Sequence, residues 1–293
     1  MLKTQEFAII KIKMVFILLL LPGLLFSAPI DLKIGARPQG MGGAFTGIAD
    51  DSNAIYNNPA GLSLIKTGEI SFMHTSPLDA KDTYIDWLCI SQPVGRASGI
   101  GFGLLYKWCF LEEGPNRTKN KMSEGEAIIS FASSMKNTVM YGASIKMLSL
   151  SSKTDKGKGI GFDLGLLYKG DFPLSNFSLG FMFRNLASQI KDESHPKEIK
   201  IGACKRFFNE RLILSGDIGI KKDVNKKETN YQTHIGIEIN PIKNIFLRTG
   251  LDRKDITAGF GFLVKNIQFD YSFLSDRDYS LPNTHRFGIN FRF

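Results

Sequence analysis

The sequence lacks several patterns that mark soluble enzymes and helical membrane proteins. Beyond residue 26 no run of 18 apolar residues occurs, so we expect no transmembrane helix in the exported chain. Cysteine is rare, and the number and spacing of Cys89, Cys109 and Cys204 predict neither a disulfide framework nor a metal centre. Cys89 and Cys109 could meet across neighbouring strands, although free buried thiols are the simpler expectation.

Catalytic motifs are also missing. The four histidines lie on separate segments without the spacing of metal ligands, and neither a Gly-x-Ser-x-Gly elbow nor a His-Glu-x-x-His motif occurs. The glycine-rich run Gly40–Gly43 lacks the flanking residues of a phosphate-binding loop. We therefore expect no enzymatic activity, no metal and no cofactor.

The positive charge of the chain does not indicate a nucleic-acid partner. The formal net charge is +9, but the Lys and Arg residues are spread along apparent loops, and no basic helix or aromatic RNA-binding signature appears. Solvated basic loops, facing anionic lipid head groups, are the expected explanation.

The N-terminus has the features of a signal peptide. Lys11 and Lys13 precede an apolar run over residues 14–26, which is too short to span a bilayer comfortably, and Ser27 and Ala28 are small. Because Pro29 disfavours cleavage after Ala28, we expect a signal peptide over residues 1–27.

From residue 67 onward the sequence alternates apolar with small or polar residues in segments of about ten. In the segment 98–106, for example, Ile100, Phe102 and Leu104 alternate with glycines. About fourteen such segments occur, and most connections after even-numbered segments are shorter than those after odd-numbered ones, among which we expect loops over residues 109–123 and 186–196. Short periplasmic turns and longer outer loops are typical of transmembrane barrels. The pattern predicts an all-β protein, a 14-stranded antiparallel transmembrane β-barrel over residues 67–293; a secreted soluble β-protein is the alternative.

Residues 28–66 do not follow the strand pattern. Glycines at 40, 42 and 43 permit close backbone approach, Asp50 or Asp51 could cap a short helix reaching about Tyr56, and Pro59 would end it.

The run from Gly35 to Leu62, with its glycine-rich start and its Asn-Pro-Ala-Gly-Leu ending, resembles the N-terminal segment of the FadL-like outer-membrane proteins, and most closely their PorV/PorQ branch. The resemblance implies a barrel plugged by residues 28–66 as an N-terminal hatch. The implied hatch positions are Gly35, Gly40, Gly42, Gly43, Asp50, Asp51, Asn57, Asn58, Pro59 and Gly61.

Strand parity predicts which charged side chains face the lumen. They could form a selectivity surface or a hatch-docking network, but structural pairing is the simpler expectation. The candidates are Lys146, Asp163, Arg184, Asp217, Glu238, Arg248, Asp270 and Arg286. The alternating C-terminal strand with Phe291 and Phe293 resembles the signal read by the outer-membrane barrel-assembly machinery, so this machinery and outer-membrane lipids are expected partners.

Two functions fit these observations. The first is an outer-membrane protein that binds or passes small hydrophobic molecules. The second, implied by the PorV branch, is an accessory or shuttle component of a protein secretion or surface-attachment system, with an exported protein as its partner and no solute transport. The sequence has no feature that separates them.

Overall fold

The computed structural model describes residues 33–76, 83–113, 118–153, 156–171, 174–190, 193–194, 196–222, 229–275 and 283–293. The expected signal peptide, residues 1–27, lies outside the described residues. No helix in the described ranges is long and apolar enough to span a membrane.

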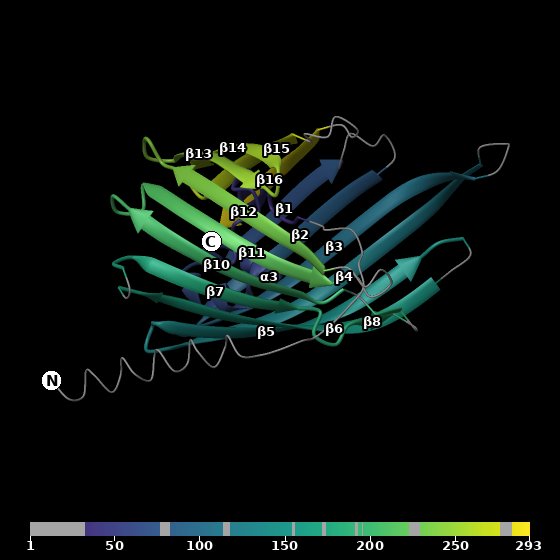
Figure 1. Cartoon of the computed structure of the whole chain (residues 1–293), viewed down its shortest axis with the longest axis horizontal. Coiled ribbons are helices and arrows are strands. Elements are labelled where there is room, and N and C mark those ends of the chain that lie inside the picture. The colour runs from purple at the N-terminus through teal and green to yellow at the C-terminus, as the bar shows by residue number, and fades with distance from the viewer. Residues whose placement is uncertain are drawn as a thin grey trace.

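Fourteen antiparallel strands close into a barrel, as predicted (Figure 1). Each strand pairs with its neighbour in the barrel; β1 closes the ring by pairing with β16, and β5 pairs with β6. The barrel strands are β1 (Glu69–Ser76), β2 (Thr83–Val94), β3 (Ser98–Glu113), β4 (Thr118–Met135), β5 (Val139–Ser151), β6 (Lys156–Gly170), β7 (Phe177–Arg184), β10 (Glu198–Phe207), β11 (Leu212–Lys222), β12 (Thr229–Ile239), β13 (Ile245–Asp252), β14 (Asp255–Val264), β15 (Ile267–Ser275) and β16 (Thr284–Arg292).

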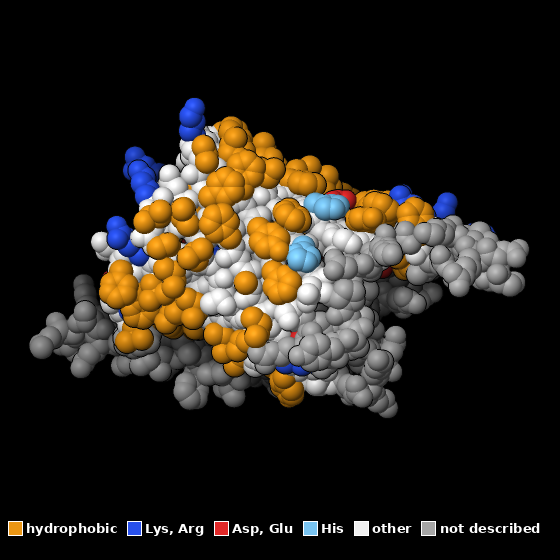
Figure 2. Space-filling model, turned by 90° about the horizontal axis from the view of Figure 1, so that it is seen from above, with side chains coloured by type: hydrophobic (Ala, Val, Ile, Leu, Met, Phe, Trp, Pro, Cys, Tyr) orange, Lys and Arg blue, Asp and Glu red, His pale blue; other side chains and the backbone are white. Residues whose placement is uncertain are grey.

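Apolar side chains cover the outside of the barrel. On β5, Tyr141, Ile145 and Met147 are exposed, while the alternate residues Gly142, Ser144 and Lys146 are buried. The outer surface in Figure 2 accordingly shows hydrophobic side chains over the wall. A closed ring of strands with an apolar outer face and charged inward positions has the architecture of a transmembrane barrel.

The short turns gather at one end of the barrel, on the left in Figure 1. In the β4–β5 turn, Lys136 and Asn137 both have positive φ, 54° and 53°, as a two-residue hairpin turn that follows the twist of the strands requires. Lys and Arg side chains stand at both ends of the wall in Figure 2.

The hairpin of β3 and β4 is longer than we expected. Residues 109–123 were expected to form a loop, but β3 continues to Glu113 and β4 begins at Thr118. Aromatic contacts extend the ladder on the outer face: the ring of Tyr84 stacks on Trp108 at 4.4 Å, and Lys121 lies 5.3 Å from the Trp108 ring.

Two further two-residue strands, β8 (Gln189–Ile190) and β9 (Glu193–Ser194), lie within the segment 186–196, which we expected to be a loop throughout. The first pairs with the loop-side end of β6.

In the described residues before the barrel, residues 33–68, the chain forms three short helices: α2 (Ala36–Gly40), α3 (Ala54–Asn57) and the 3-10 helix η1 (Pro59–Leu64). The sequence predicts a helix capped by Asp50 or Asp51, but α3 begins at Ala54. Asp51 instead accepts a hydrogen bond from the backbone N–H of Asn53 at 2.9 Å, in the turn before α3.

Candidate functional site: the segment inside the barrel

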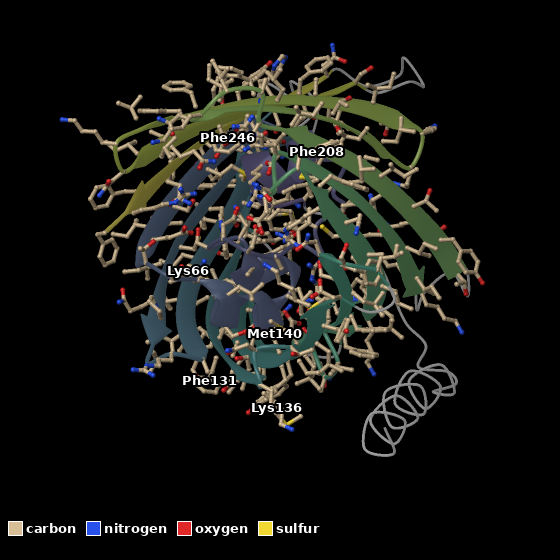
Figure 3. All side chains as sticks on the ribbon, turned by 90° about the vertical axis from the view of Figure 1, so that its left-hand side faces the viewer. Lys66, Phe131, Lys136, Met140, Phe208 and Phe246 are labelled. Atoms are coloured by element: carbon tan, nitrogen blue, oxygen red, sulfur yellow. The ribbon has the colours of Figure 1, made fainter. Side chains whose placement is uncertain are left out.

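Residues 33–65, here called the inner segment, lie inside the barrel. Figure 3, which looks into the barrel from its short-turn end, shows this ribbon surrounded by the strands. Phe45, Ile55 and Leu62 are fully buried, and Trp87 of β2 meets Tyr56 edge-on at 5.9 Å between ring centroids. The inner segment therefore supplies about half of the buried apolar side chains, and inward-facing residues of the strands such as Trp87 supply the rest.

Inward-facing glycines form the wall against which the inner segment packs. A Cβ added at Gly142 would lie 2.5 Å from the carbonyl carbon of Pro59, and one at Gly250 would lie 2.6 Å from the backbone nitrogen of Gly42. Real Cβ atoms do not approach backbone so closely. The glycines that alternate with apolar residues in the sequence thus make room for the inner segment.

Arg37 of α2 is the centre of a buried charge network. Its Nη1 lies 2.7 Å from Asp50 Oδ1 and 2.8 Å from Asp51 Oδ2, and its Nε donates to Glu238 of β12 at 2.9 Å. Arg248 of β13 reaches the same Glu238 at 2.6 Å. The network therefore joins α2, the turn before α3 and two barrel strands.

The charges of this network fix its protonation states. Burial alone would lower the pKa of Arg37, but the carboxylates of Asp50, Glu238 and Asp51 outweigh burial and raise it well above its usual value. Burial alone would raise the pKa of Asp50, but the guanidiniums of Arg37 and Arg206 outweigh it and lower that pKa. Both groups stay charged near neutral pH.

Barrel carboxylates also satisfy backbone groups of the inner segment. Asp217 of β11 accepts hydrogen bonds from the backbone N–H groups of Phe45 and Thr46, at 3.0 and 2.9 Å. Glu69 of β1 accepts from Ser52 N at 2.9 Å. An irregular segment cannot bury its amides without such partners, so the wall positions the segment.

Glu69 also crosses the seam where the barrel closes. One carboxylate oxygen accepts from Asn290 Nδ2 at 3.3 Å, and the other accepts from Arg292 Nε at 3.2 Å. The Phe293 backbone N–H donates to Gly68 O at 2.9 Å. One side chain of the first strand thus binds both the last strand and the inner segment.

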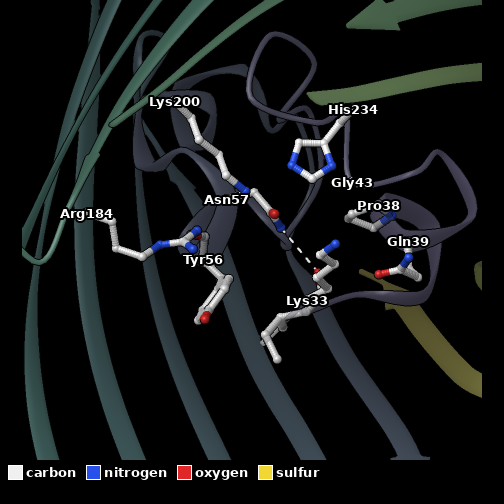
Figure 4. A pocket seen from close by; sticks show the side chains of 10 residues that line it. Lys33, Pro38, Gln39, Gly43, Tyr56, Asn57, Arg184, Lys200 and His234 are labelled. Carbon is white, nitrogen blue, oxygen red and sulfur yellow. Dashed lines mark hydrogen bonds between the residues drawn. The ribbon is translucent and has the colours of Figure 1, made fainter. Parts of the chain in front are cut away.

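A small polar cavity of about 10 Å³ lies between the inner segment and the wall (Figure 4). Its lining includes Lys33, Tyr56, Asn57, Lys200 and His234. The Arg184 guanidinium, also at the cavity, stacks over the Tyr56 ring at 4.3 Å and donates to Tyr56 O at 2.7 Å. The cavity holds about one water-sized sphere, so the lumen has no room here for a solute.

The structure places every hatch residue named from the sequence within the inner segment. Gly35, Gly42 and Gly43 have positive φ, and Asn58 donates to Thr46 O at 2.9 Å. Pro59 begins η1.

The eight lumen-facing candidates all lie on the inner wall. Seven are buried, and the Asp270 side chain is 10% exposed. Lys146 pairs with Asp163 at 3.0 Å, and Arg184 pairs with Glu198 at 2.8 Å. Phe291 and Phe293 are exposed on the outer face with their rings stacked.

Several important residues carried no signal in the sequence. Arg37 and Lys33 lie in a segment without periodicity, and only their contacts in the folded protein identify them. Arg206 lies at an inward position of β10, so strand parity could have found it. Cys89, Cys109 and Cys204 are free thiols, and among the described residues no His, Cys, Asp and Glu cluster could hold a metal ion.

Solved barrels share this architecture. TodX of Pseudomonas putida, a toluene transporter, matches with a TM-score of 0.67 and 15% identity over 92% of this chain and 98% of its own. TbuX of Ralstonia pickettii, also a toluene transporter, matches at 0.65 and 15% over 90% and 99%. A FadL homologue of Pseudomonas aeruginosa matches at 0.61 and 11% over 92% and 98%. Identities this low show the fold, and the FadL-like fold is confirmed.

The family is shown by sequence. Two proteins of Treponema pallidum (strain Nichols), both described as UPF0164 protein, are 25% identical over 181 residues, 56% of this chain and 44% of the relative, and 23% identical over 224 residues, 67% and 51%. The chain spans about half the length of these curated relatives. The model of the Uncharacterised protein family (UPF0164) matches residues 24–234, more than two thirds of the chain. The chain therefore belongs to this family.

Proposed function

We propose that this protein is an outer-membrane barrel that passes small hydrophobic molecules, with the inner segment as a movable plug. The observation that carries the proposal is a FadL-like barrel matched over nearly its whole length by two toluene transporters, with its lumen filled by one N-terminal segment. The apolar outer face and the expected signal peptide support the outer membrane as its location.

Passage requires movement of the inner segment. The cavity of about 10 Å³ beside it is smaller than any organic solute. Apart from the backbone of residues 66–68, which continues into β1, the contacts of the inner segment with the barrel strands in the described residues are hydrogen bonds, ion pairs and packing. We therefore expect α2 and the turns around it to shift or unfold locally when a molecule passes.

A disulfide lock tests this movement. A Cβ at Gly288 of β16 would lie 3.2 Å from the Cβ of Ala36, close to the separation of about 3.5–4.5 Å across a disulfide. The double variant Ala36→Cys and Gly288→Cys is made after the three native cysteines are replaced by alanine. Uptake of a fluorescent apolar probe into proteoliposomes should stop on oxidation and return on reduction.

The two single-cysteine variants are the controls and should be insensitive to oxidation. Uptake that continues through the locked protein would contradict the plug mechanism. Absence of uptake for every probe of an apolar panel, with correctly inserted protein, would contradict transport itself.

The second candidate is an accessory role in secretion or surface attachment, as in the PorV branch. One observation favours it: buried ion pairs and a close glycine wall hold the inner segment firmly, and the cavity beside it has a volume of only about 10 Å³. Photo-cross-linkers at the exposed loop-side residues Lys156 and Lys254 would test it in cells. Recovery of a specific exported protein would support this role, and recovery of none would oppose it.

A further inference from the structure

Arg286 of β16 differs from the other arginines of the inner wall. It is only 5% exposed, yet its Nε and Nη1 atoms have no hydrogen-bond partner, and it forms no ion pair with any carboxylate in the described ranges. By contrast, Arg248 lies 2.6 Å from Glu238, Arg184 lies 2.8 Å from Glu198, and Arg206 lies 3.2 Å from Asp50. A buried guanidinium without an anion is strongly unfavourable.

The residues opposite Arg286 in the neighbouring strands offer hydroxyl hydrogen-bond donors and no carboxylate that could pair with its guanidinium. In the strand register it lies opposite Ser272 of β15 and Thr75 of β1, and inward side chains at such positions are about 4.5–5.5 Å apart at Cβ. Both neighbours are buried, and the Ser272 hydroxyl also lacks a partner. The nearest inward carboxylate along β15, Asp270, is engaged by Arg248 and Gln268.

The position of Arg286 places this charge in the loop-side half of the lumen. It is the third residue of β16, which begins after the β15–β16 loop. Gly288, the next inward position, lies against Ala36 of α2. Arg286 is therefore on the loop side of the inner segment, where a group entering between the outer loops would arrive first.

We propose that Arg286 and Ser272 bind an oxyanion, a carboxylate or a phosphate, in the loop-side lumen. The guanidinium fork donates two parallel hydrogen bonds to such a group, and a serine hydroxyl can add a third. The anion would neutralise a charge that the described protein residues leave uncompensated. The site goes beyond the proposed function because a free ion would bind there even if no hydrophobic molecule passes.

Thermal unfolding of the full chain in a non-ionic detergent tests the site. Three probes are added at constant ionic strength: inorganic phosphate, acetate and a single-chain alkyl phosphate. A ligand at about ten times its Kd should raise Tm by roughly 3–5 °C. The variant Arg286→Gln should lose this shift, and Arg211→Gln, which alters an exposed arginine in the β10–β11 turn, should keep it.

The unliganded variant provides a second readout. In anion-free buffer Arg286→Gln should unfold at a higher Tm than the wild type, because an unpaired buried charge is removed. A lower Tm would overturn the proposal, since it would mean that an acid of the chain itself pairs with Arg286. The proposal would also be overturned if none of the three probes raised the Tm of the wild type, or if the probes raised the Tm of Arg286→Gln by as much as that of the wild type. Stabilisation by alkyl phosphate alone identifies an amphiphile head group as the source; stabilisation by inorganic phosphate or acetate identifies a free anion.

Discussion

At the scale of single residues, the alternation along a strand predicts which charged side chains face the lumen, but not which residues they pair with. The inward positions of Glu238, Arg248 and Asp270 follow from period-two alternation. Arg37, which pairs with Glu238, lies some two hundred residues earlier in a segment without a repeating pattern, so only the folded protein shows this pairing. The inward glycines are likewise visible in the sequence, but their purpose depends on the backbone that packs against them.

Removal of the Arg37 guanidinium should destabilise the protein severely. Arg37→Met leaves Asp50, Asp51 and Glu238 with fewer cations, and breaking a buried ion pair costs about 3–5 kcal/mol. Heat-modifiable gel migration measures the effect as a lower temperature of barrel unfolding. The control is Arg96→Met, at the exposed β2–β3 turn, which should change little; an equal loss in both variants would contradict the role of the network.

A methyl group at Gly142 should displace the inner segment. In Gly142→Ala the new Cβ would meet the backbone of Pro59 and Ala60, and such overpacking costs about 1–3 kcal/mol. Limited proteolysis should then cut the inner segment faster while the barrel stays intact. Gly216→Ala, whose new Cβ would meet only His234 O at 3.7 Å, is the matched control and should be cut at the wild-type rate.

At the scale of elements, alternation predicts the strands well because each has one face against apolar surroundings and one against the lumen. In most strands the alternating pattern of the sequence begins and ends within a few residues of the observed strand. The exception is the β3–β4 hairpin, where cross-strand contacts of Trp108 continue the ladder into a region expected to be loop. The helices were harder to place, since their short lengths give no periodicity.

The outer part of the β3–β4 hairpin should be dispensable for barrel folding. Replacement of residues 111–120 by Asn-Gly joins the paired residues Phe110 and Lys121 through a two-residue hairpin turn. The barrel should keep its heat-modifiable migration and its unfolding temperature within a few degrees, as for a tolerated loop deletion. Failure to insert would show that the long hairpin is needed for assembly.

At the scale of the whole molecule, the acid response should reflect the buried carboxylate Asp50. Its pKa is lowered in the folded state, so its contribution is present above the unfolded value of about 3.9 and is lost as pH falls through the folded value. Unfolding temperature should therefore hold from pH 7 to about pH 5 and fall only in stronger acid. In Asp50→Asn the unfolding temperature should fall less in acid below pH 5. If the wild-type unfolding temperature already declined above pH 5, and the variant abolished that decline, a lowered pKa of Asp50 would be contradicted.

The seam at Glu69 has a consequence for the order of biogenesis. Because this carboxylate binds Ser52 of the inner segment as well as Asn290 and Arg292 of the last strand, joining the two ends of the sheet and seating the inner segment are one linked event. The inner segment precedes the barrel strands in the chain and β16 follows them, so the inner segment is enclosed only when β16 pairs with β1. A chain that lacks β16 would form an open sheet in which the edges of β1 and β15 are unpaired and the inner segment is not enclosed. Quality-control proteases can recognise such exposed strand edges.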